Sequence, residues 1–215
     1  MLDGPRWGPR DGGPPQQLVI LCHGLGADGQ DLIDLAPHWA EVLPHAAFAA
    51  PDAPEPCDLG PYGRQWFSVG DRSPARRLAG ATAAAAALNP FIDAELARLG
   101  LPPGAYALMG FSQGAMTVLF TGLRRPTPPR AILAFSGALI GADTIPDRPD
   151  FPPVLLVHGE DDGVVPVRSS RDAEAALRTR GIQVESLYRP GLEHGIDHPG
   201  LAAGAQVLQR VFDQS

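Results

Sequence analysis

The sequence predicts an α/β fold in which a mostly parallel central sheet is covered by helices on both faces. Short apolar segments alternate with longer helical segments along most of the chain, which indicates parallel strands joined by helices. The apolar segments are continuous rather than alternating with polar residues, as expected for strands buried on both faces. The residues best suited to catalysis follow predicted strands, where open α/β sheets bind their ligands.

The predicted strands are short runs of apolar residues, of which QLVILC at the first position is the clearest. They lie at residues 17–22, 46–50, 106–109, 131–135, 154–157 and 184–188. No internal repeat and no linker separates two units in the sequence. We therefore expect one domain over residues 18–215, preceded by an irregular segment rich in Gly and Pro over residues 1–17.

The predicted helices lie between these strands, at residues 28–43, 74–99, 113–123, 167–180 and 200–212. The first has apolar residues at helical spacing and is ended by Pro44. In the second, Pro90 is expected to kink or divide the helix, because proline removes a backbone N–H. Residues 51–74 are dense in Pro, Gly and Asp, and an irregular loop of this length is often functional.

The composition disfavours several classes of partner. The formal net charge of −7 disfavours nucleic acid and anionic membranes, since both attract a cationic surface. The alanine-rich stretch 79–88 is too short to span a bilayer, and the N-terminus has no apolar signal segment. We therefore expect a cytoplasmic location. Two cysteines, Cys22 and Cys57, do not make a disulfide framework.

A candidate nucleophile lies between a predicted strand and a predicted helix. Residues 110–114 read GFSQG, the G-x-S-x-G pattern of a nucleophile elbow in its required strand–turn–helix context. Side chains at the two glycine positions would collide with neighbouring backbone, and the serine is held in a strained conformation. The alternative is a serine that caps the helix after a glycine turn. The context favours Ser112 as a catalytic serine.

A serine hydroxyl needs a base, and the base needs a group that orients it. His194 lies in the loop after the strand at 184–188, and His198 at the start of the last helix is its close competitor. We prefer His194, guided by the chain order of hydrolases of this type. Carboxylates at 160–162 follow another strand, and spacing alone does not separate Asp161 from Asp162. Some of these acids could instead cap the following helix.

A glycine-rich loop, HGLGADG at residues 23–29, follows the first strand. Its glycines let backbone N–H groups approach a developing oxyanion, and we expect the N–H groups of Leu25 and Gln113 to be the donors. Phosphate binding is the alternative for such a loop, but neither the G-x-G-x-x-G spacing nor a Walker lysine is present. No His, Cys or carboxylate cluster has metal-ligand spacing, so neither a metal nor an organic cofactor is expected.

These motifs together resemble the phospholipase/carboxylesterase family, which includes acyl-protein thioesterases and bacterial carboxylesterases. The resemblance runs from residue 18 to about residue 212 and rests on the segments HGLGADG at 23–29, GFSQGAM at 110–116, SGAL at 136–139, HGEDDGVVP at 158–166 and GLEHGI at 191–196. It implies a single-domain α/β-hydrolase without a cofactor. It also implies a catalytic triad of Ser112, Asp162 and His194, because the family's acid is the third residue after the glycine in HGxxDxxVP. The oxyanion donors fall on Leu25 and Gln113.

The resemblance also concerns the acyl pocket. Trp66 and Phe67 look like the family's aromatic pair on the loop after the second strand, although core packing would explain them equally well. Val165 is assigned to the substrate-binding residues with them. The rest of the loop 51–74 matches poorly, and no long insertion provides a large lid. This favours short or soluble acyl groups over triglyceride droplets.

The sequence thus predicts a serine carboxylesterase or thioesterase that acts on small-molecule esters with short to medium acyl groups, or on lysophospholipids, through an acyl-enzyme. One alternative is a serine peptidase or amidase on the same fold. Another is a non-catalytic protein that binds a ligand on a hydrolase scaffold, which an intact Ser, His and Asp in hydrolase order argue against. The family resemblance and scattered apolar residues allow a homodimer.

Overall fold

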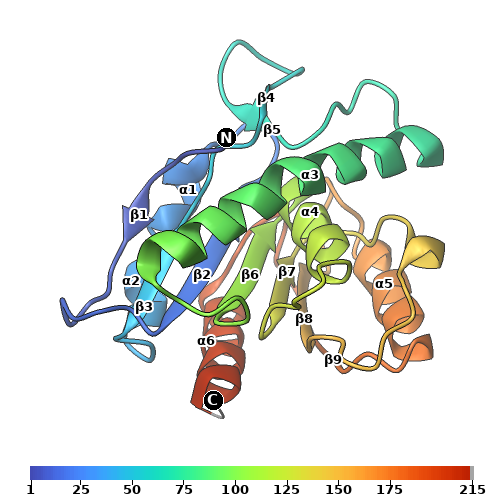
Figure 1. Cartoon of the computed structure of the whole chain (residues 1–215). Helices are drawn as coiled ribbons and strands as arrows, with labels where there is room; N and C mark the ends of the chain where they lie inside the picture. The colour runs from blue at the N-terminus through green and yellow to red at the C-terminus, as the bar shows by residue number, and fades with distance from the viewer. Residues whose placement is uncertain (214–215) are drawn as a thin grey trace.

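The computed structural model describes residues 1–213 and has the predicted α/β architecture (Figure 1). Seven strands form the central sheet in the order β1-β3-β2-β6-β7-β8-β9. All neighbouring pairs are parallel except β1 and β3, which are antiparallel. The strands are β1 (Arg6–Trp7), β2 (Gln17–Cys22), β3 (Ala46–Ala49), β6 (Tyr106–Phe111), β7 (Ile132–Phe135), β8 (Val154–Gly159) and β9 (Val184–Arg189).

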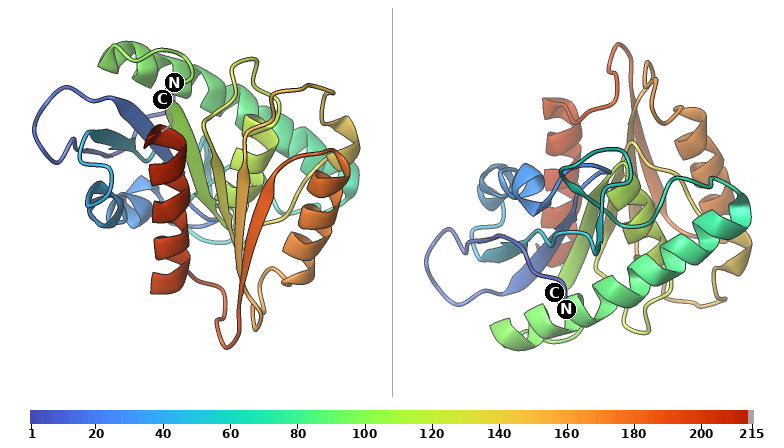
Figure 2. Two further views of the ribbon diagram at one scale, coloured as in Figure 1. Left: turned by 90° about the horizontal axis from the view of Figure 1, so that it is seen from below. Right: turned by 90° about the horizontal axis from the view of Figure 1, so that it is seen from above.

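Helices cover both faces of this sheet, as the end-on views in Figure 2 show. The helices are α1 (Gly29–Ile33), α2 (Ala36–Ala40), α3 (Pro74–Leu99), α4 (Gln113–Gly122), α5 (Arg168–Thr179) and α6 (His198–Asp213), with a short 3₁₀ helix at Ala142–Thr144. Strand β2 shows why two layers form: Leu18 and Ile20 face α3 and α4, whereas Val19 and Leu21 face α1, α2 and α6. Burial of both faces explains the continuous apolar pattern of the strands.

The single helix predicted over 28–43 is wrong, because this segment contains two short helices, α1 and α2. Asp28 caps the first helix, its side chain accepting the N–H of Gln30. Pro37 lies in the first turn of the second helix. Proline has no N–H to donate to the preceding turn, so the first helix cannot continue through it. Proline is well tolerated at a helix start, so a second helix begins there.

Helix α3 is continuous through Pro90, so the expected division of the helix at this proline is wrong. The ring removes one hydrogen bond, but buried residues on both sides of it, including Leu88 and Ile92, anchor the helix on the sheet. Ser73 caps its N-terminus by accepting the N–H of Arg76, and Gly100 ends it with a left-handed φ of 69°. Tertiary packing thus outweighs the helix-breaking tendency of proline.

Two segments that were expected to be irregular contain short strands. The N-terminal segment 1–17 supplies β1, and Arg6 of this strand forms an ion pair of 2.7 Å with the buried Glu95 of α3. The division of the chain into this segment and a domain over 18–215 stays a prediction. Within the loop 51–74, β4 (Glu55–Pro56) and β5 (Arg64–Gln65) form a small antiparallel sheet above the carboxyl ends of the central strands (Figure 1).

Cys22 and Cys57 are both free thiols, and burial raises the pKa of the Cys22 thiol. Among residues 1–213, no helix is both long enough and apolar enough to cross a membrane. The same part of the chain contains no group of three or more His, Cys, Asp or Glu side chains arranged to hold a metal ion.

Candidate active site

Ser112 lies on a sharp turn between β6 and α4. Its backbone has φ 55° and ψ −117°, a conformation rarely adopted by residues other than glycine. The flanking glycines make the turn possible: a Cβ at Gly110 would overlap the carbonyl of Gly114, and one at Gly114 would overlap the carbonyl of Cys22. The N–H of Ser112 donates to Phe135 on the neighbouring strand at 2.8 Å, which fixes the turn to the sheet.

The side chains of Ser112, His194 and Asp162 form one chain of hydrogen bonds. The Ser112 hydroxyl donates to Nε2 of His194 at 3.0 Å, and Nδ1 of the same ring donates to Oδ2 of Asp162 at 2.7 Å. The three residues follow β6, β9 and β8, so their loops meet at the carboxyl end of the sheet. The ring of Phe111 packs against the imidazole, with the two ring centres 4.8 Å apart.

Asp162 is the carboxylate that points into this site, whereas its two acidic neighbours, Glu160 and Asp161, are exposed. Its side chain is 0 % exposed, and its Oδ1 accepts the N–H groups of Val164 and Val165, both at 2.8 Å. Burial raises the pKa of Asp162, but the hydrogen bonds from His194 and from these two amides outweigh burial and lower the pKa below its usual value. The carboxyl is therefore held as an anion behind the imidazole.

The alternative base, His198, is exposed at the start of α6 and forms no hydrogen bond to Asp162 in the described part of the chain. Of the candidates that sequence spacing left open, His194 and Asp162 are the pair that a hydrogen bond of 2.7 Å joins.

His158 is a further histidine beside this site. It lies within β8, fully buried, and its Nε2 donates to the carbonyl of Val165 at 2.8 Å. The same nitrogen is 3.2 Å from Oδ2 of Asp162, and Nδ1 accepts the hydroxyl of Ser170 at 2.6 Å. Burial lowers the pKa of His158, more than Val165 and Asp162 raise it. A neutral ring thus supports the segment that holds Asp162.

The expected oxyanion donors, the N–H groups of Leu25 and Gln113, are both beside Ser112 in the lining of one cavity. Neither N–H donates to another group within residues 1–213. Gln113 is the first residue of α4, so its N–H lies at the positive end of the helix dipole. Two unpaired N–H groups next to a serine hydroxyl form a site suited to a developing negative charge.

The loop that carries Leu25 is fixed from both sides. The N–H of Gly26 donates to Arg64 at 2.8 Å, and the N–H of Arg64 returns to Ala27 at 2.8 Å. Below the loop, Nδ1 of His23 donates to the carbonyl of Gly24 at 2.7 Å, and its Nε2 accepts the N–H of Ala53 at 3.0 Å. Burial lowers the pKa of His23, which keeps this ring neutral.

Trp66 does not line the cavity, in contrast to the expectation for the aromatic pair, whereas Phe67 does. The indole is 1 % exposed and donates to the carbonyl of His23 at 2.9 Å, so it lies behind the glycine-rich loop. The side chain of Gln113 connects both residues to α4: it accepts the N–H of Trp66 at 2.8 Å and donates to the carbonyl of Phe67 at 2.7 Å. Trp66 is a structural support of the site.

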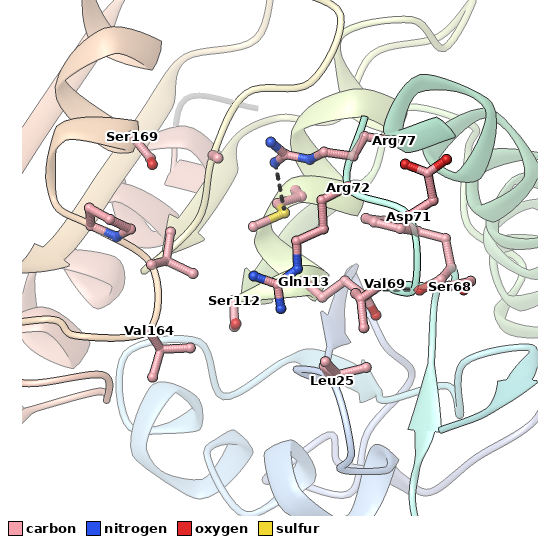
Figure 3. A pocket seen from close by; sticks show the side chains of 15 residues that line it. Leu25, Ser68, Val69, Asp71, Arg72, Arg77, Ser112, Gln113, Val164 and Ser169 are labelled. Atoms are coloured by element: carbon pink, nitrogen blue, oxygen red, sulfur yellow. Dashed lines mark hydrogen bonds between the residues drawn. The ribbon is translucent and has the colours of Figure 1, made fainter. Parts of the chain in front are cut away.

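The cavity around Ser112 has a volume of about 230 Å³ (Figure 3). Its apolar lining includes the expected Phe67 and Val165, together with Met116 and Val69, which sequence reasoning missed. A second group of lining residues is charged, namely Asp71, Arg72 and Arg77, and was also missed. Binding cavities for drug-sized ligands are larger, on the order of 300–1,000 Å³. This cavity is smaller and fits a group of short to medium length.

Comparisons with known proteins show which family this chain is similar to. The sequence model of a family described as Phospholipase/Carboxylesterase matches residues 10–211. "Esterase YpfH" of Escherichia coli (strain K12) is 30 % identical over 186 residues, covering 86 % of this chain and 78 % of that protein. "Acyl-protein thioesterase 1" of Schizosaccharomyces pombe is 31 % identical over 206 residues, covering 90 % of each chain. The crystal structure of esterase PE8 is 40 % identical, has a TM-score of 0.90 and matches over 98 % of this chain and 99 % of that chain.

Proposed function

The chain belongs to the phospholipase/carboxylesterase family and is a carboxylic ester hydrolase, and from this premise we propose that it cleaves short to medium acyl esters or thioesters with Ser112 as nucleophile. The observation that carries the proposal is the chain of hydrogen bonds from Ser112 through His194 to Asp162, next to two N–H groups without partners.

The first half of the reaction acylates Ser112. As its Oγ attacks the ester carbonyl, Nε2 of His194 takes the hydroxyl proton, and Asp162 stabilises the resulting imidazolium through Nδ1. The carbonyl oxygen becomes an oxyanion, which accepts the N–H groups of Leu25 and Gln113. Each such donor contributes about 2.7–4 kcal/mol to stabilising the transition state. The imidazolium then protonates the leaving alcohol or thiol as the tetrahedral intermediate collapses.

The second half of the reaction releases the acid. The neutral His194 takes a proton from water, which attacks the acyl-enzyme carbonyl and again places an oxyanion against the same two N–H groups. Collapse of this intermediate returns the proton to Ser112. The cavity of about 230 Å³ beside the serine supports acyl groups of short to medium length rather than long lipid chains.

Hydrolysis of p-nitrophenyl esters of graded chain length tests the proposal. We expect measurable turnover by the purified chain and a fall of at least about 10³-fold in kcat for Ser112→Ala, as seen when triad serines are removed. Thioester and anilide substrates measured in parallel determine which acyl derivative is preferred. Equal, low rates for the two proteins would exclude Ser112 as the nucleophile.

A homodimer and a cytoplasmic location stay predictions from the sequence. Light scattering coupled to size-exclusion chromatography measures the mass of the assembly and tests the first of them.

A further inference from the structure

Two arginines in the lining of the Ser112 cavity lack the partners that other arginines of this protein have. Guanidinium groups elsewhere bond carboxylates or backbone carbonyls, as Arg171 does with Glu160 and Arg124 with Gly141. Within residues 1–213, only those of Arg72, Arg77 and Arg130 form neither a hydrogen bond nor an ion pair with such an oxygen. Two of these three line the cavity that contains Ser112. The unpaired cations are thus concentrated at the proposed active site.

Arg77 lies in the first turn of α3 and is half-buried. Its Nη2 donates to the thioether sulfur of Met116 at 3.8 Å. A thioether is a weak acceptor, so this contact does not replace a carboxylate or carbonyl partner. A partly buried cation without a counterion is unfavourable, because desolvation is not compensated. An anion bound in the cavity would supply the missing partner.

Arg72 reaches the same cavity from the loop before α3. Figure 3 shows its guanidinium in the cavity, on the side that faces Ser112 and Leu25, with Arg77 beyond it. An arginine presents several N–H donors in a plane, a geometry that matches the two oxygens of a carboxylate.

Asp71 is the carboxylate of this lining, and its oxygens have other partners. Its Oδ1 accepts the N–H of Ser73 at 2.8 Å, and its Oδ2 lies 3.8 Å from Nε of Arg76, an exposed arginine outside the lining. It forms no ion pair with Arg72 or Arg77 within the described chain. The protein carries a net charge of −7, so the cationic character here is local rather than a property of the whole surface.

We propose that the preferred substrates are esters or thioesters whose acyl group ends in a carboxylate, which Arg72 and Arg77 bind while Ser112 attacks the carbonyl at the other end. The proposal rests on the proposed ester hydrolysis and names its substrate class. The acyl side is chosen because the two arginines share their cavity with Phe67 and Met116, whose side chains line the space beside the serine. The products are the corresponding dicarboxylate and the alcohol or thiol.

A matched pair of substrates tests this: the 4-nitrophenyl half-ester of adipic acid and 4-nitrophenyl hexanoate. The two acyl chains differ in a terminal carboxylate against a methyl group, and spontaneous hydrolysis is subtracted from each rate. For the wild-type chain we expect kcat/KM to be about tenfold higher for the half-ester, as expected for charge-assisted pairing at a partly exposed site. Raising the salt concentration should reduce this ratio, because the site is open to screening.

Arg72→Gln and Arg77→Gln should each lower the ratio of the two kcat/KM values by several-fold, because each removes one ion pair with the substrate carboxylate. The double variant should abolish the preference for the half-ester. The matched control is Arg76→Gln, which removes an exposed arginine from the same turn of α3 but outside the cavity. It should leave the ratio unchanged. A third ester, 4-(hexanoyloxy)benzoate, carries its carboxylate on the leaving group. Its kcat/KM should therefore not change in Arg72→Gln.

The outcomes separate this inference from the proposed function. If the wild type hydrolyses 4-nitrophenyl hexanoate through Ser112 but the ratio of kcat/KM for the half-ester to that for the hexanoate is one or lower, the acyl-carboxylate proposal is wrong and the esterase proposal stands. The same conclusion follows if the arginine variants lower kcat/KM only for 4-(hexanoyloxy)benzoate. If neither ester is hydrolysed, calorimetric titration with adipate decides the anion site alone. Binding to the wild type that is lost in the double variant supports the site, and absence of binding overturns it.

Discussion

The two sides of the cavity around Ser112 are built differently. On the sheet side, the proposed catalytic groups already have hydrogen-bond partners within the protein: Asp162 bonds two amides and His194, and His194 bonds Ser112. On the side of the loop 51–74 and α3, the guanidinium groups of Arg72 and Arg77 have no oxygen partner within residues 1–213.

This difference indicates that the two sides of the cavity have different roles in the reaction. Groups that stabilise a transition state work best when they are already oriented, so that no reorganisation is needed during the reaction. Groups that recognise a substrate can remain unpaired until the substrate arrives. We therefore expect changes on the sheet side to reduce turnover or stability, and changes on the loop side to alter substrate preference.

The largest effect is expected for Asp162→Asn. The side chain keeps its shape and one oxygen for the amides of Val164 and Val165, but an amide cannot hold Nδ1 of His194 as a donor in the same way. We expect kcat to fall by about 10⁴-fold with KM little changed, because the imidazole then favours the unproductive tautomer. Steady-state kinetics with a p-nitrophenyl ester measures this.

Asp161→Asn is the matched control, since Asp161 is an exposed carboxylate beside it. Its kcat should stay within about twofold of wild type. Comparable losses in the two variants would argue that the whole acidic segment, rather than Asp162 alone, supports the reaction.

Gly114→Ala tests the rigidity of the sheet side through folding. A Cβ at this position overlaps the backbone carbonyls of Cys22 and His23, which the sheet holds in place. We expect the free energy of unfolding to fall by about 3 kcal/mol, at the upper end for overpacked sites. Urea denaturation followed by circular dichroism measures the change.

Gly60→Ala provides the contrasting substitution on the loop side, where an added Cβ meets no atom within 4 Å. Its free energy of unfolding should stay within about 0.5 kcal/mol of wild type. Similar losses for the two glycines would contradict the difference between the two sides.

Gln113→Ala tests the connection between the two sides, because this side chain bonds the backbone of Trp66 and Phe67. The substitution leaves a buried N–H and a buried C=O without partners, and we expect a loss of about 2 kcal/mol in the free energy of unfolding. The loop should also become less well placed, so KM for esters should rise more than kcat falls. Gln30→Ala, at an exposed glutamine, should change neither quantity.

The smallest effect concerns the dependence of stability on pH. Burial lowers the pKa of His158 and His23 below the ordinary histidine value of 6.5, so the unfolded chain binds protons there that the folded chain does not. Stability is therefore fully present above that value and decreases as the pH falls below it.

His158→Gln should reduce the steepness of this decrease by up to about 1.4 kcal/mol per pH unit, the contribution of one proton. Urea titrations between pH 7.5 and pH 5.5 measure the slope. An unchanged slope would show that His158 titrates alike in the folded and unfolded chain.

The strands and the sharp turn at Ser112 could be predicted because their signals are local. A continuous apolar run such as 17–22 predicts a buried strand with few alternatives. The G-x-S-x-G pattern directly predicts the turn between a strand and a helix. The effects of Pro37 and Pro90 were harder to predict, since proline starts one helix and is tolerated within another according to its packing.

The contacts between distant segments could not be read from local patterns. Gln113 bonds the backbone of Trp66, which is 47 residues away in the chain, and this bond places the indole behind the glycine-rich loop. The loop 51–74 has no periodicity, so nothing in it indicated that Arg72 would reach the cavity. The contact of His158 with Asp162 had one weak signal, a histidine at the end of a strand four residues before the acid.

The central claim is that Ser112 is the nucleophile, and labelling with a fluorophosphonate tests it most directly. After reaction of the wild-type chain, tandem mass spectrometry of its peptides identifies the modified residue. We expect one adduct per chain, on Ser112, and a large reduction in its rate of formation in His194→Ala. An adduct on another serine, or an unlabelled chain that still hydrolyses esters, would contradict it.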